Sequence, residues 1–399
     1  MLPLSLLIAA TLISFLFLTL TTYYRLNFND LQDIAIGFSR PIWGYSDKPN
    51  FLYEIPYYGY ESPSISCELY GWRERYGQDV GIVYDTFIFS TELNLLEIRL
   101  KELNTVVKHW ILVESDRTHT NLPKTLWWHD VGRHQARFAP YLSRIESIVV
   151  RGNDIDRSGN FRRSGAYGLE ALQRQAIMKG LHTVGIQDGD VFITGDIDEI
   201  PKRQIAQLFQ HCDLFPPDIT LHMPTFIGGF QFTSYEEDKR HTKVRMYRKN
   251  RVHPNWVSHH AKIGDTLLLN AGWHCSWCFQ TLNQFRFKMK AGVHSDRGSI
   301  VSNSFINERL CRGEPPLERR YQRPESYTYY DVKQRWFEKW DVEGRRVNRN
   351  TTRLVLPLAL RALNVEKFNY LMPGGECNRK EDRNRTRNLI LKSGYMLKV

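Results

Sequence analysis

Two aspartates, Asp196 and Asp198, directly follow an apolar run at residues 191–194. Because alternate residues of an extended segment point to the same side, their carboxylates can share one ligand. Proteins hold Mg²⁺ or Mn²⁺ with one or two carboxylates plus phosphate oxygens, and the cation then neutralises a departing diphosphate. The alternative is an acidic loop at the positive end of the next helix. The position of the pair at the end of a predicted strand favours the metal site.

Three further charged residues belong to segments that we expect at the same edge of a sheet. Glu199 is a third carboxylate, which either supports the aspartate pair or interacts with the dipole of the following helix. Glu114 ends another predicted strand, and Arg174 lies on the helix before the acidic motif. Arg174 is a candidate for holding a diphosphate, although single charged residues on helices are usually solvated.

His274 precedes the motif Cys275-x-x-Cys278. A Cys-x-x-Cys motif is redox-active, half of a zinc site or a structural disulfide, and a four-cysteine zinc site would need a second such pair. In an oxidising compartment the structural disulfide is the preferred interpretation. His274 is either a ligand for a cation or a buried, hydrogen-bonded histidine.

A second histidine, His294, follows a predicted basic helix in the segment His294-Ser295-Asp296-Arg297. His294 and the neighbouring cations could bind phosphate oxygens. Asp296 is a candidate general base.

The elements expected to position these residues alternate between strand and helix. Strands are predicted at residues 82–89, 110–113, 148–150 and 190–194, with helices at residues 93–103 and 169–181, and Pro201 in the first turn of another helix. This order is typical of an α/β protein with a parallel sheet, in which ligands bind at the carboxyl ends of the strands. The first strand is followed by neither a dinucleotide-binding glycine motif nor a P-loop.

The second half of the chain is less regular. Strands are predicted at residues 224–232, 244–247 and 267–277, a helix at 279–291, and a loop-rich cap from Glu314 onward.

The composition excludes disorder, because 42% of the 399 residues are hydrophobic. The net charge of +11 attracts anions. A dense basic run at residues 239–251 is interpreted as a solvated face, and the lack of zinc-finger spacing, RNP motif or heptads argues against nucleic acid as a partner.

The N-terminus predicts a membrane anchor. Residues 1–24 hold a long uncharged apolar run that ends at two tyrosines, which is typical of a signal-anchor transmembrane helix; a cleaved signal peptide is the alternative. Glycosylation sequons at Asn350 and Asn384 and an even number of cysteines, six, agree with a lumenal body. We expect a stem at 25–80 and a lumenal catalytic domain at 81–399, with its motif-bearing core at about 85–300 and the cap at about 301–399.

Together, these motifs resemble glycosyltransferase family 17. The resemblance runs from Asp85 to Tyr370, and the order and spacing of the motifs make it more specific than any single motif. The matching pieces are Asp85-Thr86-Phe87-Ile88-Phe89, Glu92-Leu93, Leu96-Glu97-Ile98-Arg99-Leu100, Val113-Glu114-Ser115, Gln173-Arg174, Gly180-Leu181, Asp196-Ile197-Asp198-Glu199-Ile200-Pro201, Gly272-Trp273-His274-Cys275-Ser276-Trp277-Cys278-Phe279 and His294.

The resemblance implies a type II Golgi membrane enzyme with a GT-A-like fold. Such an enzyme would move N-acetylglucosamine from UDP-GlcNAc to a mannose of a glycoprotein N-glycan in a β-1,4 linkage, with Mn²⁺ or Mg²⁺ as cofactor. By analogy, the metal ligands would be Asp196, Asp198 and His274. The nucleotide sugar would be held by Asp196, Asp198, Arg174, Glu114 and His294. Transfer with inversion needs a general base, for which the candidates are Asp296, Glu199 and Glu114.

Two other classes of function are alternatives for the same motifs. A lumenal metal-dependent phosphoesterase could use the same carboxylates. A non-catalytic, membrane-anchored carbohydrate-binding protein could keep the fold, although a pure binding protein has no need of a metal-diphosphate site.

Overall fold

The structure is a computed structural model of the chain. It describes residues 52–57, 66–75, 80–152, 166–234, 242–249, 264–291, 302–314, 316, 329–331, 356–361, 363, 365–372, 375, 377 and 379. No helix in these ranges is long and apolar enough to span a membrane. The predicted anchor at 1–24, both sequons, His294 and Asp296 lie outside the described residues.

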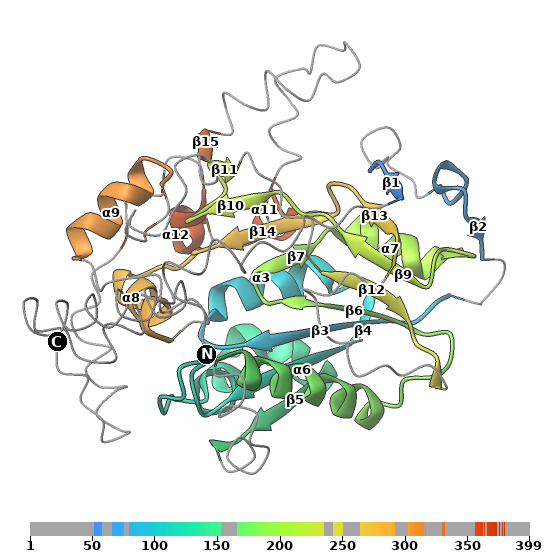
Figure 1. Cartoon of the computed structure of the whole chain (residues 1–399), viewed down its shortest axis with the longest axis horizontal. Helices are drawn as coiled ribbons and strands as arrows, with labels where there is room; N and C mark the ends of the chain where they lie inside the picture. The colour runs from blue at the N-terminus through green and yellow to red at the C-terminus, as the bar shows by residue number, and fades with distance from the viewer. Residues whose placement is uncertain are drawn as a thin grey trace, which may run out of the picture. The chain divides into compact units, whose positions relative to one another are not determined.

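A mixed sheet of eight strands is the centre of the described fold (Figure 1). Every neighbouring pair is parallel except those formed by β12, which runs antiparallel to both β6 and β9. The prediction of an α/β protein with a mostly parallel sheet is therefore confirmed. In spatial order the strands are β1 (Tyr53–Ile55), β13 (Thr266–Leu268), β9 (Asp218–Leu221), β12 (Lys243–Met246), β6 (Val191–Asp196), β3 (Val83–Phe89), β4 (Val107–Ser115) and β5 (Ile145–Val150).

Helices cover both faces of this sheet because alternate residues of each central strand enter opposite cores. On β3, Phe87 joins the core that contains the leucines of α3 (Leu93–Leu103) and the apolar side of α7 (Arg203–His211). Tyr84, three residues earlier and therefore on the opposite face of the strand, joins the other core, beneath α6 (Ala166–Thr183). The period of two in β3 thus produces a helix–sheet–helix arrangement.

A second sheet lies on the far side of α3. Leu96 and Leu100 of α3 pack into the core of the main sheet, whereas Leu95 and Ile98 pack against the second sheet, so the helix is buried on two sides. The strands of the second sheet are, in spatial order, β15 (Tyr329–Asp331), β11 (Phe232–Ser234), β10 (Thr225–Ile227), β14 (Gly272–Ser276) and β7 (Glu199–Pro201).

Three sequence predictions need correction here. The single strand expected at 267–277 is two strands in different sheets, β13 and β14, separated by a turn in which Asn270 has a φ of 51°. The strand expected at 224–232 is the antiparallel pair β10 and β11. Pro201 ends β7 instead of starting a helix, because α7 begins two residues later at Arg203.

The remaining described elements are helices of ten residues or fewer and two strands of two residues. They are η1 (Glu68–Tyr70), β2 (Arg73–Glu74), the turns η2 (Trp127–Val131), η3 (Gly132–His134) and η4 (Ala136–Arg144), β8 (Cys212–Asp213), α8 (Leu282–Ala291), α9 (Asn303–Cys311), α11 (Leu358–Arg361), α12 (Val365–Phe368) and η9 (Asn369–Leu371).

Segments from both ends of the described chain are attached to the sheets. β1, within the predicted stem, adds a parallel edge strand to the main sheet beside β13. Phe368 and Leu371 are buried in the core between α3 and the second sheet. Disulfides reinforce the fold at Cys67–Cys212, Cys275–Cys278 and Cys311–Cys377.

The strand order locates the edge at which a ligand should bind. From β3 the chain continues to β4 and β5 on one side and then returns through α6 to β6 on the other side of β3. The carboxyl ends of β3 and β6 therefore form a topological switch point, where open α/β sheets bind their ligands. Asp196, the last residue of β6, pairs in register with Ile88 of β3 at this edge.

We expect Gly180→Ala to destabilise the protein by about 1 kcal/mol. Gly180 of α6 packs so closely on β4 that an added Cβ would overlap Cγ2 of the fully buried Ile111. Overpacking of this kind costs about 1–3 kcal/mol, which the better helix propensity of alanine offsets by about 1 kcal/mol. Chemical denaturation measures the difference. The exposed neighbour Lys179→Ala is the control, and equal stability of both variants would contradict the close packing.

Candidate functional site

A buried ion pair holds the acidic turn in place. Arg99 of α3 makes two hydrogen bonds to the carboxylate of Asp85 on β3, of 2.8 and 2.7 Å, and both side chains are fully buried. The remaining terminal nitrogen of Arg99 donates to the carbonyl oxygens of Asp196 (2.6 Å) and Glu199 (2.8 Å). One guanidinium therefore connects the central strand, the helix and both ends of the acidic turn.

Glu199 braces the turn from inside. Its Oε2 accepts hydrogen bonds from the backbone N–H of Asp196 (3.1 Å) and from the hydroxyl of Thr242 (2.9 Å). The turn is also closely packed at Gly195, where an added Cβ would lie 2.8 Å from that same Oε2 and overlap the Thr242 hydroxyl. A side chain at position 195 would push the brace away, so glycine keeps the turn compact. The structure thus gives Glu199 the supporting role.

Arg174 of α6 reaches the same turn from the other face of the sheet. Its guanidinium pairs with the carboxylate of Asp196, donates to the carbonyl of Gly195 (3.1 Å) and contacts Glu170 one helical turn earlier (3.3 Å). Burial alone would lower the pKa of Arg174, but the carboxylates of Asp196 and Glu170 outweigh that effect and raise it. A permanent positive charge therefore lies beside Asp196, whose own side chain is 34% exposed.

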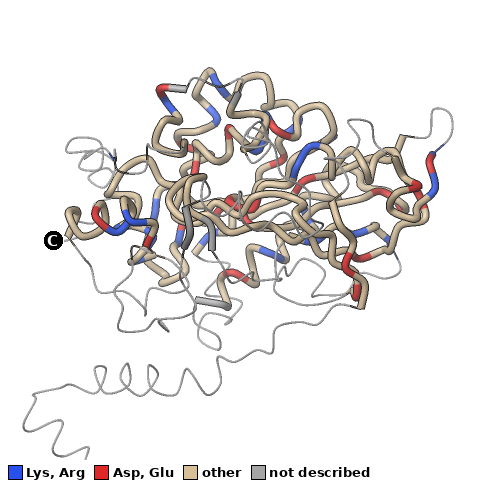
Figure 2. Tube along the Cα trace, turned by 90° about the horizontal axis from the view of Figure 1, so that it is seen from above, with Lys and Arg blue, Asp and Glu red and all other residues tan. Residues whose placement is uncertain are grey.

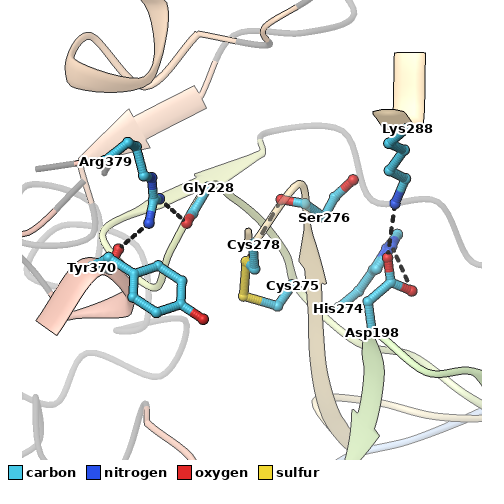
Figure 3. The surroundings of a disulfide bond; sticks show 9 residues. All are labelled: Asp198, Gly228, His274, Cys275, Ser276, Cys278, Lys288, Tyr370 and Arg379. Carbon is cyan, nitrogen blue, oxygen red and sulfur yellow. Dashed lines mark hydrogen bonds and ion pairs between the residues drawn. A yellow bond between two sulfur atoms is a disulfide. The ribbon is translucent and has the colours of Figure 1, made fainter. Parts of the chain in front are cut away.

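Asp198 faces a second cation and an imidazole (Figure 3). Its Oδ2 lies 3.3 Å from Nζ of Lys288 on α8, and its Oδ1 lies 4.0 Å from Nε2 of His274 on β14. His274 Nδ1 is in turn 3.3 Å from the hydroxyl of Thr225. Burial lowers the pKa of Lys288, yet the nearby carboxylates of Asp198 and Glu92 reverse this and raise it. The ammonium group therefore stays charged beside Asp198.

The Cys275–Cys278 disulfide shapes the wall next to this group. The backbone N–H of Cys275 donates to the carbonyl of Asp198 (2.8 Å), and the turn continues through Trp277, which has a φ of 58°. The ammonium of Lys288 lies 5.5 Å from the ring centre of Trp277 and 5.4 Å from that of Phe279. The expectation that this motif is a structural disulfide agrees with the structure, and its turn also provides aromatic packing for Lys288.

Glu114 has an anchoring role at the end of β4. Its carboxylate is fully buried and accepts hydrogen bonds from the backbone N–H groups of Trp128 (3.1 Å) and His129 (2.8 Å) at the start of η2. Burial is the main cause of its raised pKa. Both oxygens are thus engaged by the main chain, which fixes η2 against the sheet.

The loop after β4 connects the carboxyl edge to α6 and α8. The backbone N–H of His119 donates to the carbonyl of Ala291 at the end of α8 (3.1 Å), and its Nε2 lies 3.1 Å from Oε1 of Gln173 on α6. The hydroxyl of Thr120 donates to the carbonyl of Lys290 (3.0 Å). These contacts fix the helix that carries Lys288 relative to the helix that carries Arg174.

Sequence reasoning gave no separate role to three residues around this site, although the cations of the helix that carries Lys288 were expected to bind phosphate oxygens. Lys288 is one of several cations on a basic helix, and only the fold distinguishes it from its neighbours. Glu92 follows β3 directly, and its position at a strand end was a usable signal. Thr242 comes from a segment 43 residues after Glu199, and no local pattern indicated their contact.

The predicted site residues fall into three groups. Asp196, Asp198, Glu199, Arg174 and His274 come together around the acidic turn. Glu114 lies at the end of the neighbouring strand with its carboxylate turned to the backbone of η2. His294 and Asp296 are outside the described ranges.

The donor set fits one mode of divalent-cation binding. Within the described ranges no cluster of three or more His, Cys, Asp or Glu side chains could hold a metal ion. A cation here would instead be bound by the two aspartates of one turn together with the phosphates of a substrate, which is how Mg²⁺ is commonly held. Basic and acidic residues are interspersed along the described trace (Figure 2).

Comparison with known proteins now identifies the family. A family model named glycosyltransferase family 17 matches residues 5–380. The chain belongs to glycosyltransferase family 17. Among its similar curated relatives are proteins named beta-1,4-mannosyl-glycoprotein 4-beta-N-acetylglucosaminyltransferase. The rat relative is 25% identical over 241 residues, which is 54% of this chain and 43% of the relative.

The human relative of the same name is 25% identical over 232 residues, which is 51% of this chain and 42% of that protein. This family 17 chain therefore spans less than half the length of the curated relatives that it matches. The family membership agrees with the resemblance inferred from the motifs.

We expect Arg99→Met to destabilise this family 17 protein by about 3–5 kcal/mol, because it leaves the carboxylate of Asp85 buried without a partner. The control is Arg73→Met, which breaks an ion pair of similar length with Asp213 (2.8 Å) whose arginine is 58% exposed. Exposed pairs contribute about 0–1 kcal/mol. Chemical denaturation of both variants measures the difference, and equal losses would contradict the central role of the buried pair.

Proposed function

We propose that this protein is a metal-dependent, inverting glycosyltransferase that moves N-acetylglucosamine from UDP-GlcNAc to a mannose of a glycoprotein N-glycan in a β-1,4 linkage. The observation that carries the proposal is the acidic turn of Asp196 and Asp198 at the switch point of the sheet, flanked by Arg174 and Lys288. Family membership and the printed name of the relatives support the donor sugar and the linkage.

Mn²⁺ or Mg²⁺ is the proposed cofactor. Asp196 and Asp198 would hold the cation together with phosphate oxygens of the substrate. His274, whose Nε2 lies 4.0 Å from Oδ1 of Asp198, stays a ligand predicted from the sequence, because the described side chains form no cluster of three ligands. A bound cation would neutralise negative charge as the diphosphate leaves. Arg174 pairs with the carboxylate of Asp196 and fixes its orientation, so that the turn offers a preorganised group instead of a flexible one.

A GT-A-like fold is the proposed architecture. It is supported by the parallel strands β5, β4, β3 and β6, by the antiparallel strand β12 beside them, and by the aspartate pair at the carboxyl end of β6. This arrangement leaves the carboxyl ends of β3 and β6 for the nucleotide, as expected for an open α/β sheet.

Three carboxylates are candidates for the general base. A base must reach the acceptor hydroxyl and accept its proton. The described contacts of Glu199 and Glu114 are to donors of the protein itself, and Glu114 is fully buried, so the structure favours neither. Asp296 stays a prediction from the sequence.

The proposed location is the Golgi membrane, with a single N-terminal anchor and the catalytic part in the lumen. The described disulfides support an oxidising compartment, because such bonds are rare in the cytosol.

The test is a transfer assay on the purified full chain with UDP-GlcNAc and N-glycan acceptors, in Mn²⁺ or in EDTA, followed by mass spectrometry. We expect a gain of one N-acetylhexosamine on the glycan in Mn²⁺ and its loss in EDTA. Release of phosphate from simple esters without transfer would favour the phosphoesterase. Glycan binding without UDP release, unchanged in EDTA, would favour the carbohydrate-binding protein.

We expect Asp198→Ala to lower kcat/KM for transfer by at least about 100-fold while the protein stays folded, because the variant removes a carboxylate that would face the cation at the developing charge. The matched control is Asp188→Ala. Asp188 is an exposed aspartate in the turn that precedes β6, where it accepts one hydrogen bond from the backbone N–H of Lys249. Normal transfer by a folded Asp198→Ala variant would contradict the proposed site.

A further inference from the structure

Lys288 differs from Arg99 and Arg174 because it has N–H donors that no described residue accepts. Arg99 directs its guanidinium at Asp85 and at two backbone carbonyls, and Arg174 directs its own at Asp196, Glu170 and Gly195. These two arginines therefore organise the protein itself.

The ammonium of Lys288 has three N–H donors. Within the part of the chain that the structure describes, its one hydrogen-bond acceptor is Oδ2 of Asp198, at 3.3 Å (Figure 3). The side chain of Lys288 is 30% exposed, whereas that of Asp198 is 10% exposed. Donors of Lys288 thus remain for a ligand that enters from the solvent side.

The position of this ammonium is set by packing as well as by charge. The rings of Trp277 and Phe279 lie within 5.5 Å of Nζ, and Phe285 stacks against Trp277, so aromatic faces line the stem of the lysine. The backbone bonds from His119 and Thr120 hold the end of α8 against the loop after β4. Lys288 is therefore a positioned cation and not a freely rotating surface residue.

We propose that Lys288 binds the diphosphate of the nucleotide and stabilises the charge that it acquires on leaving. The proposal rests on the proposed function, because it assumes a nucleotide diphosphate at the switch point. An ammonium is a compact point charge that suits phosphate oxygens. A cation fixed where negative charge develops stabilises the transition state more than one that must first be oriented.

A site that contains Lys288 should behave differently without divalent ions from a site of metal ligands alone. Because Lys288 is a cation supplied by the chain itself, part of the affinity for the diphosphate should persist when divalent ions are removed. It also explains why a lysine is placed against Asp198: each charge compensates the other before the ligand arrives.

The test is calorimetric titration of the purified full chain with UDP in EDTA. We expect Lys288→Met to weaken UDP binding at least tenfold and Lys288→Arg to retain most of the affinity. The matched control is Lys290→Met on the same helix. Residues two apart on a helix do not face each other, so Lys290 points away from the side of Lys288 and its removal should change the affinity less than twofold.

Uridine, which lacks phosphates, serves as the reference ligand. Wild type and Lys288→Met should bind uridine equally, which would show that the nucleoside site is still folded in the variant. Equal UDP affinity of wild type and Lys288→Met would overturn the role of Lys288 and leave the proposed function intact. Failure of the folded wild type to bind UDP even with Mn²⁺ would overturn the proposed function and this inference together.

Discussion

The buried pair of Arg99 and Asp85 is the interaction on which the rest of the site depends. A buried guanidinium needs hydrogen-bond acceptors, and here a carboxylate and two backbone carbonyls accept from all three of its nitrogens. Because those carbonyls belong to Asp196 and Glu199, the hydrogen bonds that satisfy the arginine also fix the acidic turn. Desolvating two charges is costly, so the pair is better understood as fixing one conformation than as a large source of stability.

The same turn connects the two sheets. Asp196 ends a strand of the main sheet, and Glu199 begins a strand of the second sheet, with Asp198 between them. The backbone carbonyl of Asp198 accepts a hydrogen bond from Cys275, which places the disulfide turn and its aromatic residues beside the carboxylate. The candidate site therefore lies where the two sheets meet, and α3, buried on two sides, holds them together.

Prediction from the sequence succeeded where a local pattern had one interpretation. The apolar runs at 82–89 and 190–194 and the helical spacing of the leucines at 93–103 are such patterns, and the structure has the corresponding strand or helix at each. Prediction was wrong at 267–277, where a continuous apolar run hides a turn at Asn270 between two sheets. It was also wrong at Pro201, because the pairing of β7 with β14 delays the helix. Thr242 escaped notice, and Lys288 was not distinguished from the other cations of its helix, because their partners are distant in the sequence.

The sequence alone determined the α/β class, the acidic motif at a strand end and the resemblance to a glycosyltransferase family, since each depends on local patterns and on their order along the chain. Only the tertiary structure decided what the individual charges do. It turned Glu114 and Glu199 toward donors of the protein, aimed Arg174 at Asp196 and placed Lys288 against Asp198. The physical reason is that the behaviour of a charge depends on its solvation and its nearest partners, and in this fold those partners come from other strands and helices.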